Sequence, residues 1–292
     1  MVGMVGWTLR VALTLALVSS ADLAVASPAP IPGDAAPAAR VERPSATTTA
    51  AVDELLDLSG LKVQLAAISA GIRVQFLGTR GGLSAQDLAV IDRIAARHFS
   101  AEMLYARMRL ELERSVDTGR LEGALAWYRS PLGRRITRAE LAALASAGEE
   151  VSIPWPSDER IELIQRLDAT GGAAETAVDV TLAIVRSLTR ALDPFRSAHL
   201  RQAPDELEAR LASVRVEALA PIRIACLQNM LFAYRDLDDA ELGEYVRFME
   251  SAAGQWYATT MNGALVSAVV VASELAAVDL VTLLPQLSGG LR

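Results

Sequence analysis

The chain has very few of the residues from which disulfides and metal sites are built. Its 292 residues include one cysteine, Cys226, and two histidines, His98 and His199. An intrachain disulfide needs a pair of cysteines, and a structural zinc site usually takes four cysteine or histidine ligands. The sequence therefore predicts no disulfide, no metal site and no cofactor.

The same scarcity limits what the individual cysteine and histidines can do. Cys226 comes four residues after Ile222 in an apolar helical pattern, which is typical of a small buried side chain. Pairing with a cysteine of another chain is the alternative. His98 lies on the apolar side of a helical pattern that includes Ile91. This position favours a core histidine, with a general base as the alternative.

Lysine and aromatic residues are also scarce. Lys62 is the only lysine, aromatic residues make up 5% of the chain, and the formal net charge is −7. This charge argues against non-specific nucleic-acid binding, which depends on a basic surface. The apolar fraction of 52% is rich in alanine, which favours helices over strands. The composition predicts a helical protein with an ample core.

The first apolar run is too short to cross a bilayer. The run "VALTLALV" follows Arg10, whereas a membrane-spanning helix needs about 20 residues. The small residues Ala24-Val25-Ala26 then form a cleavage pattern. We expect residues 1–26 to be a signal peptide cleaved after Ala26. Because a disulfide framework is lacking, the periplasm is the expected location.

Two further segments are expected to differ from the body of the protein. Residues 27–50 are rich in proline, alanine and threonine, which predicts a disordered linker. Residues 263–284 form a long apolar run, interrupted by Glu274 and Asp279. A carboxylate at the centre of a membrane costs several kcal/mol. The run is therefore interpreted as the most buried helix of a bundle, and no transmembrane span is expected after signal cleavage.

Two stretches of the chain resemble each other. Aligning "LEGALAWYRSPLG" from Leu121 with "LGEYVRFMESAAG" from Leu242 superimposes a serine and a glycine in each copy, and both carry apolar residues at helical spacing. We predict an all-α helical bundle made of two tandem repeats of about four to five helices each. The predicted repeats are 51–152 and 157–285. In the first repeat, helices are expected near 53–77, 84–98, 100–116, 118–129 and 131–149. In the second repeat, Pro221 is expected to mark a helix start, because proline is favoured in the first helical turn.

The junction between the predicted repeats is "VSIPWPSDER". Its two prolines interrupt any helix. Trp155, which stands between them, is expected to pack against the body as an anchor, with ligand stacking as the alternative.

The stretch "WYRSPLGRRI" predicts the start of a helix. Serine is favoured at an N-cap, and proline is favoured at the first helical position. Glycine so early in a helix is unfavourable, so it indicates a close approach of two helices. The residues of this structural motif are Trp127, Tyr128, Ser130, Pro131 and Gly133, with Ser251 and Gly254 in the second copy.

Four arginines surround this helix start: Arg129, Arg134, Arg135 and Arg138. A helix N-terminus attracts anions, so they form a candidate surface for an anion or a protein partner. The alternative is a solvated helix face, with acids such as Glu140 neutralising some of the arginines.

These helix starts resemble a bacterial family known as domain of unknown function 2059. The match is "WYRSPLGRRI" at 127–136, with "FMESAAGQWY" at 248–257 as a degenerate second copy that lacks the proline. The resemblance implies an all-helical protein of the periplasm or envelope. Because the family carries no established reaction, it implies no catalytic residue.

The expected function is therefore binding. The first hypothesis is a non-catalytic module of the cell envelope for protein interaction or self-association. The second is a carrier that holds a hydrophobic or anionic small molecule between the repeats. The third, an enzyme, lacks any pair of acids that stands out from the ordinary charge of helix surfaces.

Overall fold

The computed structural model describes residues 46–78, 85–146, 155–193 and 203–287. These residues are almost entirely helical and include no strand. The prediction of an all-α fold is confirmed. The predicted signal peptide lies outside the described residues, as does most of the predicted linker.

The N-terminal part of the bundle follows the predicted helices with one break. Gly60 adopts φ 69°, a left-handed conformation that glycine tolerates, and it divides the helix predicted at 53–77. The first helix begins at Ala46, so the last residues of the predicted linker are helical. The helices are α2 (Ala46–Leu58), α3 (Leu61–Gly78), α4 (Ala85–His98), α5 (Ala101–Arg114), α6 (Thr118–Arg129) and α7 (Pro131–Ala145).

The C-terminal part contains longer helices. They are α8 (Asp158–Gly171), α9 (Ala173–Leu192), α10 (Pro204–Ala233), α11 (Asp239–Glu250) and α12 (Ala252–Leu287). Helix α10 continues through Pro221, where the sequence predicted a new helix start. Proline removes one helical hydrogen bond. Buried Ala218, Ile222 and Cys226 on the inner face hold both sides of this position against the bundle.

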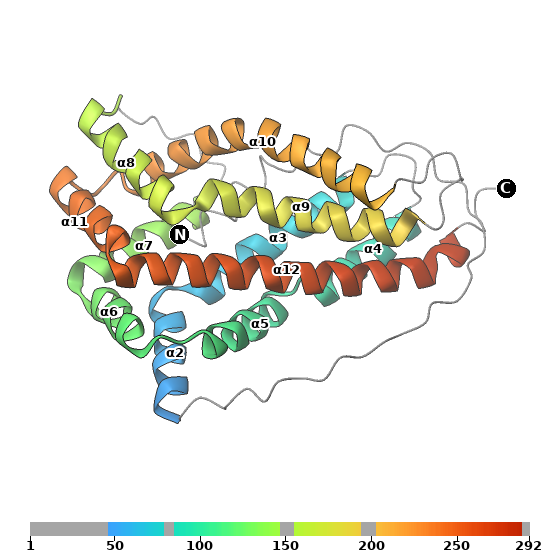
Figure 1. Cartoon of the computed structure of the whole chain (residues 1–292), viewed down its shortest axis with the longest axis horizontal. Helices are drawn as coiled ribbons and strands as arrows, with labels where there is room; N and C mark the ends of the chain where they lie inside the picture. The colour runs from blue at the N-terminus through green and yellow to red at the C-terminus, as the bar shows by residue number, and fades with distance from the viewer. Residues whose placement is uncertain (1–45, 79–84, 147–154, 194–202, 288–292) are drawn as a thin grey trace.

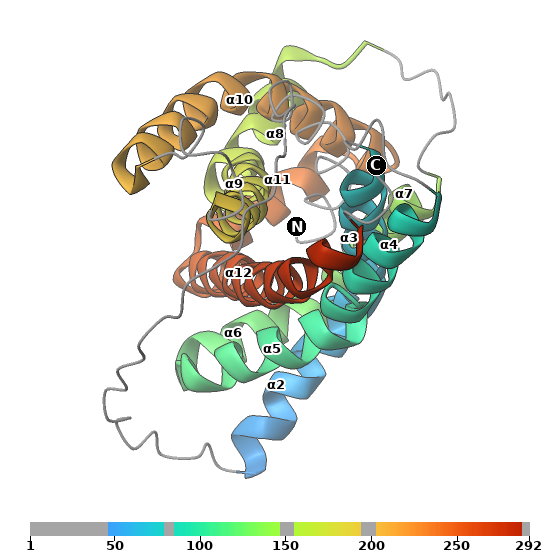
Figure 2. The ribbon, with the colours of Figure 1, turned by 90° about the vertical axis from the view of Figure 1, so that its right-hand side faces the viewer.

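Helix α12 runs along the long axis of the molecule (Figure 1). It packs against α9, α8 and α11 from the C-terminal part and against α4, α5 and α6 from the N-terminal part. Seen from the end, α9 and α10 lie on one side of α12, and α5 and α6 lie on the other (Figure 2). The core is therefore continuous between the two parts.

Several packing relations recur in the two parts. Helix α2 packs on α6 as α8 packs on α11, and α3 packs on α4 and α5 as α9 packs on α10. The turn before α3 and the turn before α9 each contain a left-handed glycine, Gly60 and Gly172. However, α7 has 15 residues, whereas α12 has 36. These relations are consistent with a duplication, which stays a prediction.

The expectation of no transmembrane span is wrong. Pro204–Ala233 and Ala252–Thr282 are each long and apolar enough to cross a membrane. Glu274 and Asp279 do not prevent this in the second helix, because it begins before the predicted run and residues 256–273 carry no charge. The first helix qualifies because it is continuous through Pro221. Half of the apolar window in Ala252–Thr282 is buried within the bundle.

Candidate functional site

The two helix starts singled out in the sequence have the same local geometry. Ser130 is the N-cap of α7, and its Oγ accepts a hydrogen bond from the Gly133 N–H at 2.9 Å. Ser251 precedes α12 and accepts from the Gly254 N–H at 3.2 Å. Each serine therefore satisfies a backbone donor that has no partner within its helix.

Both glycines are required by a close backbone approach. A Cβ atom at Gly133 would overlap the carbonyl oxygen of Trp127, and one at Gly254 would overlap that of Phe248. The first turn of α7 thus lies directly against the last turn of α6, and the same holds for α12 and α11. No other residue fits either position without a backbone shift.

The aromatic residues of the two motif copies pack against each other. The rings of Trp127 and Phe248 are stacked with centroids 4.5 Å apart and an interplanar angle of 5°. Tyr128 packs on Tyr257 at 5.1 Å. The motif therefore forms the contact between the N-terminal and C-terminal parts of the bundle.

A buried carboxylate lies beside this contact. Glu140 of α7 accepts hydrogen bonds at Oε1 from the hydroxyl of Tyr234 at 2.7 Å and from that of Tyr245 at 3.1 Å. Burial, together with the nearby charge of Glu140, raises the pKa of both tyrosines well above that of an ordinary phenol. The tyrosines stay protonated and act as donors.

The four arginines of the candidate anion surface have different surroundings. Arg129 forms two hydrogen bonds of 2.7 Å with Glu54 of α2. Arg135 pairs with Glu241 and donates to the carbonyl of Asp236 at 2.7 Å. Arg134 and Arg138 are exposed. The structure thus places two of the four in ion pairs with different helices, and the anion surface stays a prediction.

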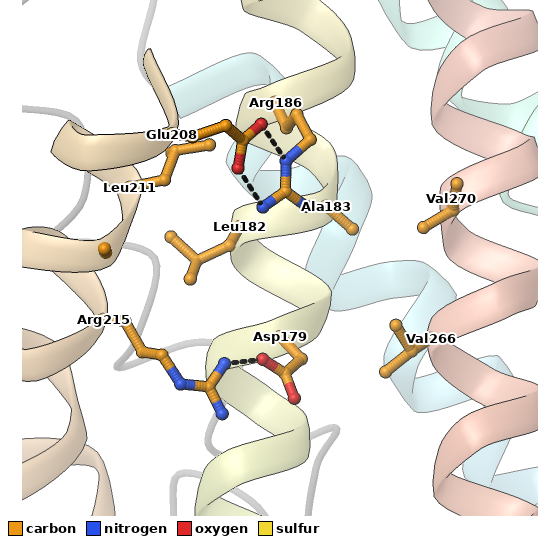
Figure 3. Close-up of a pocket in the computed structure, with 10 residues that line it drawn as sticks. Asp179, Leu182, Ala183, Arg186, Glu208, Leu211, Arg215, Val266 and Val270 are labelled. Atoms are coloured by element: carbon orange, nitrogen blue, oxygen red, sulfur yellow. Dashed lines mark hydrogen bonds and ion pairs between the residues drawn. The ribbon is translucent and has the colours of Figure 1, made fainter. Parts of the chain in front are cut away.

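A pocket of about 270 Å³ lies between α9, α10 and α12. Two ion pairs cross it, one between Arg186 and Glu208 and the other between Arg215 and Asp179 (Figure 3). Its other lining residues are apolar: Leu182, Ala183, Leu211, Ala212, Val266 and Val270. All three helices belong to the C-terminal part, so this pocket is not the one expected between the repeats. No sequence pattern indicated this pocket, because its walls come from three distant segments.

A second polar cluster lies where α8 meets α9 and α10. The Asp168 side chain is almost fully buried, and its Oδ2 lies 3.4 Å from Arg223 Nε, while Arg223 also pairs with Glu175. Burial, followed by the charge of Glu175, raises the pKa of Asp168 to about 6. Asp168 Oδ1 and Glu175 Oε2 are buried without a hydrogen-bond partner. No sequence pattern pointed to this cluster.

The remaining predicted residues are placed as follows. Cys226 is buried, as expected. His98 is largely buried, and its Nε2 lies 2.7 Å from Asp279 Oδ2. Trp155 is 92% exposed, so the prediction that it packs on the body is wrong. Pro156 and the N-cap Ser157 separate it from α8. Within the described ranges, no three histidine, cysteine or acidic side chains gather as metal ligands do.

The resemblance found in the sequence is confirmed by a family model. The model, described as "Uncharacterized protein conserved in bacteria (DUF2059)", matches residues 104–152. The match includes α6, α7 and the first helix-start motif, and the second copy at 248–257 lies outside it. No curated protein and no solved structure matches the chain.

Proposed function

We propose that this chain is an exported, non-catalytic protein of the bacterial envelope that binds another protein chain through the outer face of helix α10. One observation carries the proposal. Val216 is 76% exposed and Ile224 is 59% exposed, and exposed Ala209 and Ala220 lie on the same stripe of the helix. Contiguous exposed apolar side chains are typical of binding surfaces.

The buried network at the motif contact supports an ordering role rather than catalysis. The buried tyrosines beside Glu140 are held as hydrogen-bond donors at a packing contact, with their proton affinity raised rather than tuned towards neutral pH. This network orders the core, so we infer that the outer surface performs the function.

The proposed surface is tested by site-specific photocrosslinking in cells. A photoreactive residue at Val216 is expected to form adducts with a protein, and one at Val63 of α3, which is also exposed, is not. The adduct at Val216 is expected to disappear when Ile224→Asp is added. Equal crosslinking at Val216 and Val63 would contradict the proposal.

The pocket between α9, α10 and α12 supports a second function, a carrier for a small amphipathic molecule. Its apolar lining suits a short hydrocarbon chain, and an anionic end group would replace Glu208 or Asp179 as the partner of Arg186 or Arg215. A volume of about 270 Å³ limits the ligand to a small molecule. Native mass spectrometry of the protein isolated from the periplasm tests this. Loss of a bound species in Ala183→Trp would support the carrier, and its retention would contradict it.

Export is tested separately. The proposal predicts that the mature protein begins at Ser27, which N-terminal sequencing of the protein from a periplasmic extract measures. An intact Met1, or recovery from the cytoplasm, would contradict export.

A further inference from the structure

The outer face of α10 carries charges of both signs beside its apolar stripe. At 3.6 residues per turn, Arg210 and Glu217 lie along one flank of the stripe, and Asp205 and Arg223 lie along the other. All four side chains are exposed. The Ser213 hydroxyl donates a hydrogen bond of 3.0 Å to Glu217 Oε1, which holds this carboxylate close to the stripe.

The two pairs nearly share a centre. The midpoint of Arg210 and Glu217 falls between Ser213 and Val214, and the midpoint of Asp205 and Arg223 falls at Val214, half a residue away. Each pair joins one basic residue with one acidic residue. When a second copy of this helix runs in the opposite direction, the basic residue of each pair lies opposite the acidic residue of the same pair.

We propose that the partner of α10 is a second copy of this chain, packed antiparallel about a two-fold axis at Ser213 and Val214. This inference rests on the proposed function and names its partner. A two-fold axis perpendicular to the helix places each flank against the same flank of the other copy. Arg210 then faces Glu217 of the second copy, and the symmetry repeats this contact.

The same register fits the apolar stripe and the second flank. Val216 then lies between Ser213 and Ala209 of the second copy, so that small side chains lie opposite a larger one. Asp205 faces Arg223 of the second copy, although Arg223 is also engaged by Glu175 within its own chain. The paired segment 205–223 is about 27 Å long at 1.5 Å per residue. A contact along one helix pair is small, so the dimer dissociates on dilution.

The charges favour a second copy over a lipid surface. Helices that lie on membranes carry mainly lysine and arginine beside their apolar face. Here each flank contains an acid, and a bilayer offers no fixed partner for it. A second copy supplies one at every position.

Cysteine crosslinking of the purified mature chain tests the register. Ser213 lies near the proposed axis, so Ser213→Cys is expected to form disulfide-linked dimers under copper-catalysed air oxidation. Ala209→Cys is the matched control on the same stripe. Its two copies would lie about 15 Å apart along the helices, beyond the Cα separation of about 7 Å that a disulfide spans. Equal crosslinking of the two variants would overturn the register. Cys226 is buried and does not interfere.

Charge reversal tests the ion pairs. Arg210→Glu and Glu217→Arg are each expected to raise the dimer dissociation constant about tenfold, because each places like charges opposite each other twice per dimer. The double variant is expected to return to within about twofold of the wild type. Sedimentation equilibrium without detergent measures these constants.

The outcomes separate this inference from the proposed function. A dimer whose dissociation constant is unchanged by both charge reversals overturns the register. A chain that stays monomeric, but whose Val216 crosslinks to a different protein in cells, overturns the second copy and keeps the proposed function. If the monomer floats with phospholipid vesicles and Val216→Asp abolishes this flotation, both the second copy and the proposed function are overturned.

Discussion

The two helix starts at Ser130 and Ser251 show which parts of a motif are fixed by backbone geometry. In both, a serine caps the helix, and a glycine follows where the preceding helix leaves no space for a Cβ atom. Pro131 follows the first serine, whereas Ala252 follows the second. The serine satisfies a backbone donor, as other capping residues could, and the glycine occupies a space that no other residue fits. The proline only favours the helix start.

The charges beside the two helix starts follow no such constraint. Arg129 of α6 pairs with Glu54 of α2, and Glu250 of α11 pairs with Arg166 of α8. The two contacts join corresponding helices with opposite polarity. An exposed ion pair requires complementary charges but no particular sign at either end.

Replacement of the glycines would affect the two helix starts most strongly. Gly133→Ala and Gly254→Ala are each expected to lower the free energy of unfolding by about 3 kcal/mol or more, because the new methyl group forces a backbone shift. Urea unfolding measures this. Gly263→Ala is the control, since a Cβ there meets nothing within 4 Å. It is expected to stabilise α12 by about 0.5–1 kcal/mol. If Gly133→Ala changed the free energy of unfolding as Gly263→Ala does, the close backbone approach at Gly133 would be contradicted.

Changes in the buried polar network beside the motif contact are expected to have the next largest effect on stability. Tyr234→Phe removes the 2.7 Å hydrogen bond to Glu140 and is expected to cost about 1.5–3 kcal/mol. Tyr245→Phe removes the 3.1 Å bond and is expected to cost less. Thermal unfolding compares the two variants with Tyr105→Phe, whose half-buried ring lies outside this network. Equal effects of all three would show that Glu140 does not order the contact.

A pH effect would distinguish the two turns. The turn before α9 lies beside buried Asp168, whereas Asp57 beside the turn before α3 is exposed and pairs with Lys62. The pKa of Asp168 is raised from 3.8 to about 6, so the folded state binds more protons than the unfolded state between these values. Stability from this group is full below pH 3.8 and is lost as the pH rises through 6.

Asp168→Asn should remove that dependence. The difference in unfolding free energy between wild type and variant is expected to change by roughly 3 kcal/mol across this window, with the wild type losing stability as the pH rises. Urea titrations from acidic to neutral pH measure the difference. Parallel curves for the two proteins would contradict the assignment.

Reversing one ion pair should have the smallest effect. Glu54→Arg combined with Arg129→Glu gives the first helix start the polarity of the second. The melting temperature is expected to change little, whereas Glu54→Arg alone places like charges together and lowers it. If the double variant were as unstable as the single one, the sign would depend on further neighbours.

Much of the fold was predictable from local patterns. Helical spacing gave the all-α class, and Ser130 with Pro131 gave a helix boundary at the observed position. The break at Gly60 was missed because a left-handed glycine within an apolar pattern has no signature of its own. Pro221 was misinterpreted for the opposite reason, since its local signal is strong and tertiary packing overrides it.

The candidate sites were less predictable, because they join distant segments. Glu140 follows Ile136 by one helical turn, which is the only sign that it faces the core, and nothing in its neighbourhood names Tyr234. The pocket depends on how α9, α10 and α12 meet. Only the stripe on α10 lies within one helix, and its exposure depends on how the other helices pack around α10.

Helix α12 determines how the chain unfolds. It is tied to the N-terminal part at one end by Tyr257 on Tyr128 and near the other by Asp279 on His98. Removal of α12 would expose, at the same time, the apolar surfaces that it covers on the N-terminal part and on the C-terminal part. Neither part could then survive as a stable fragment, and denaturation should proceed as one all-or-none event across the whole bundle.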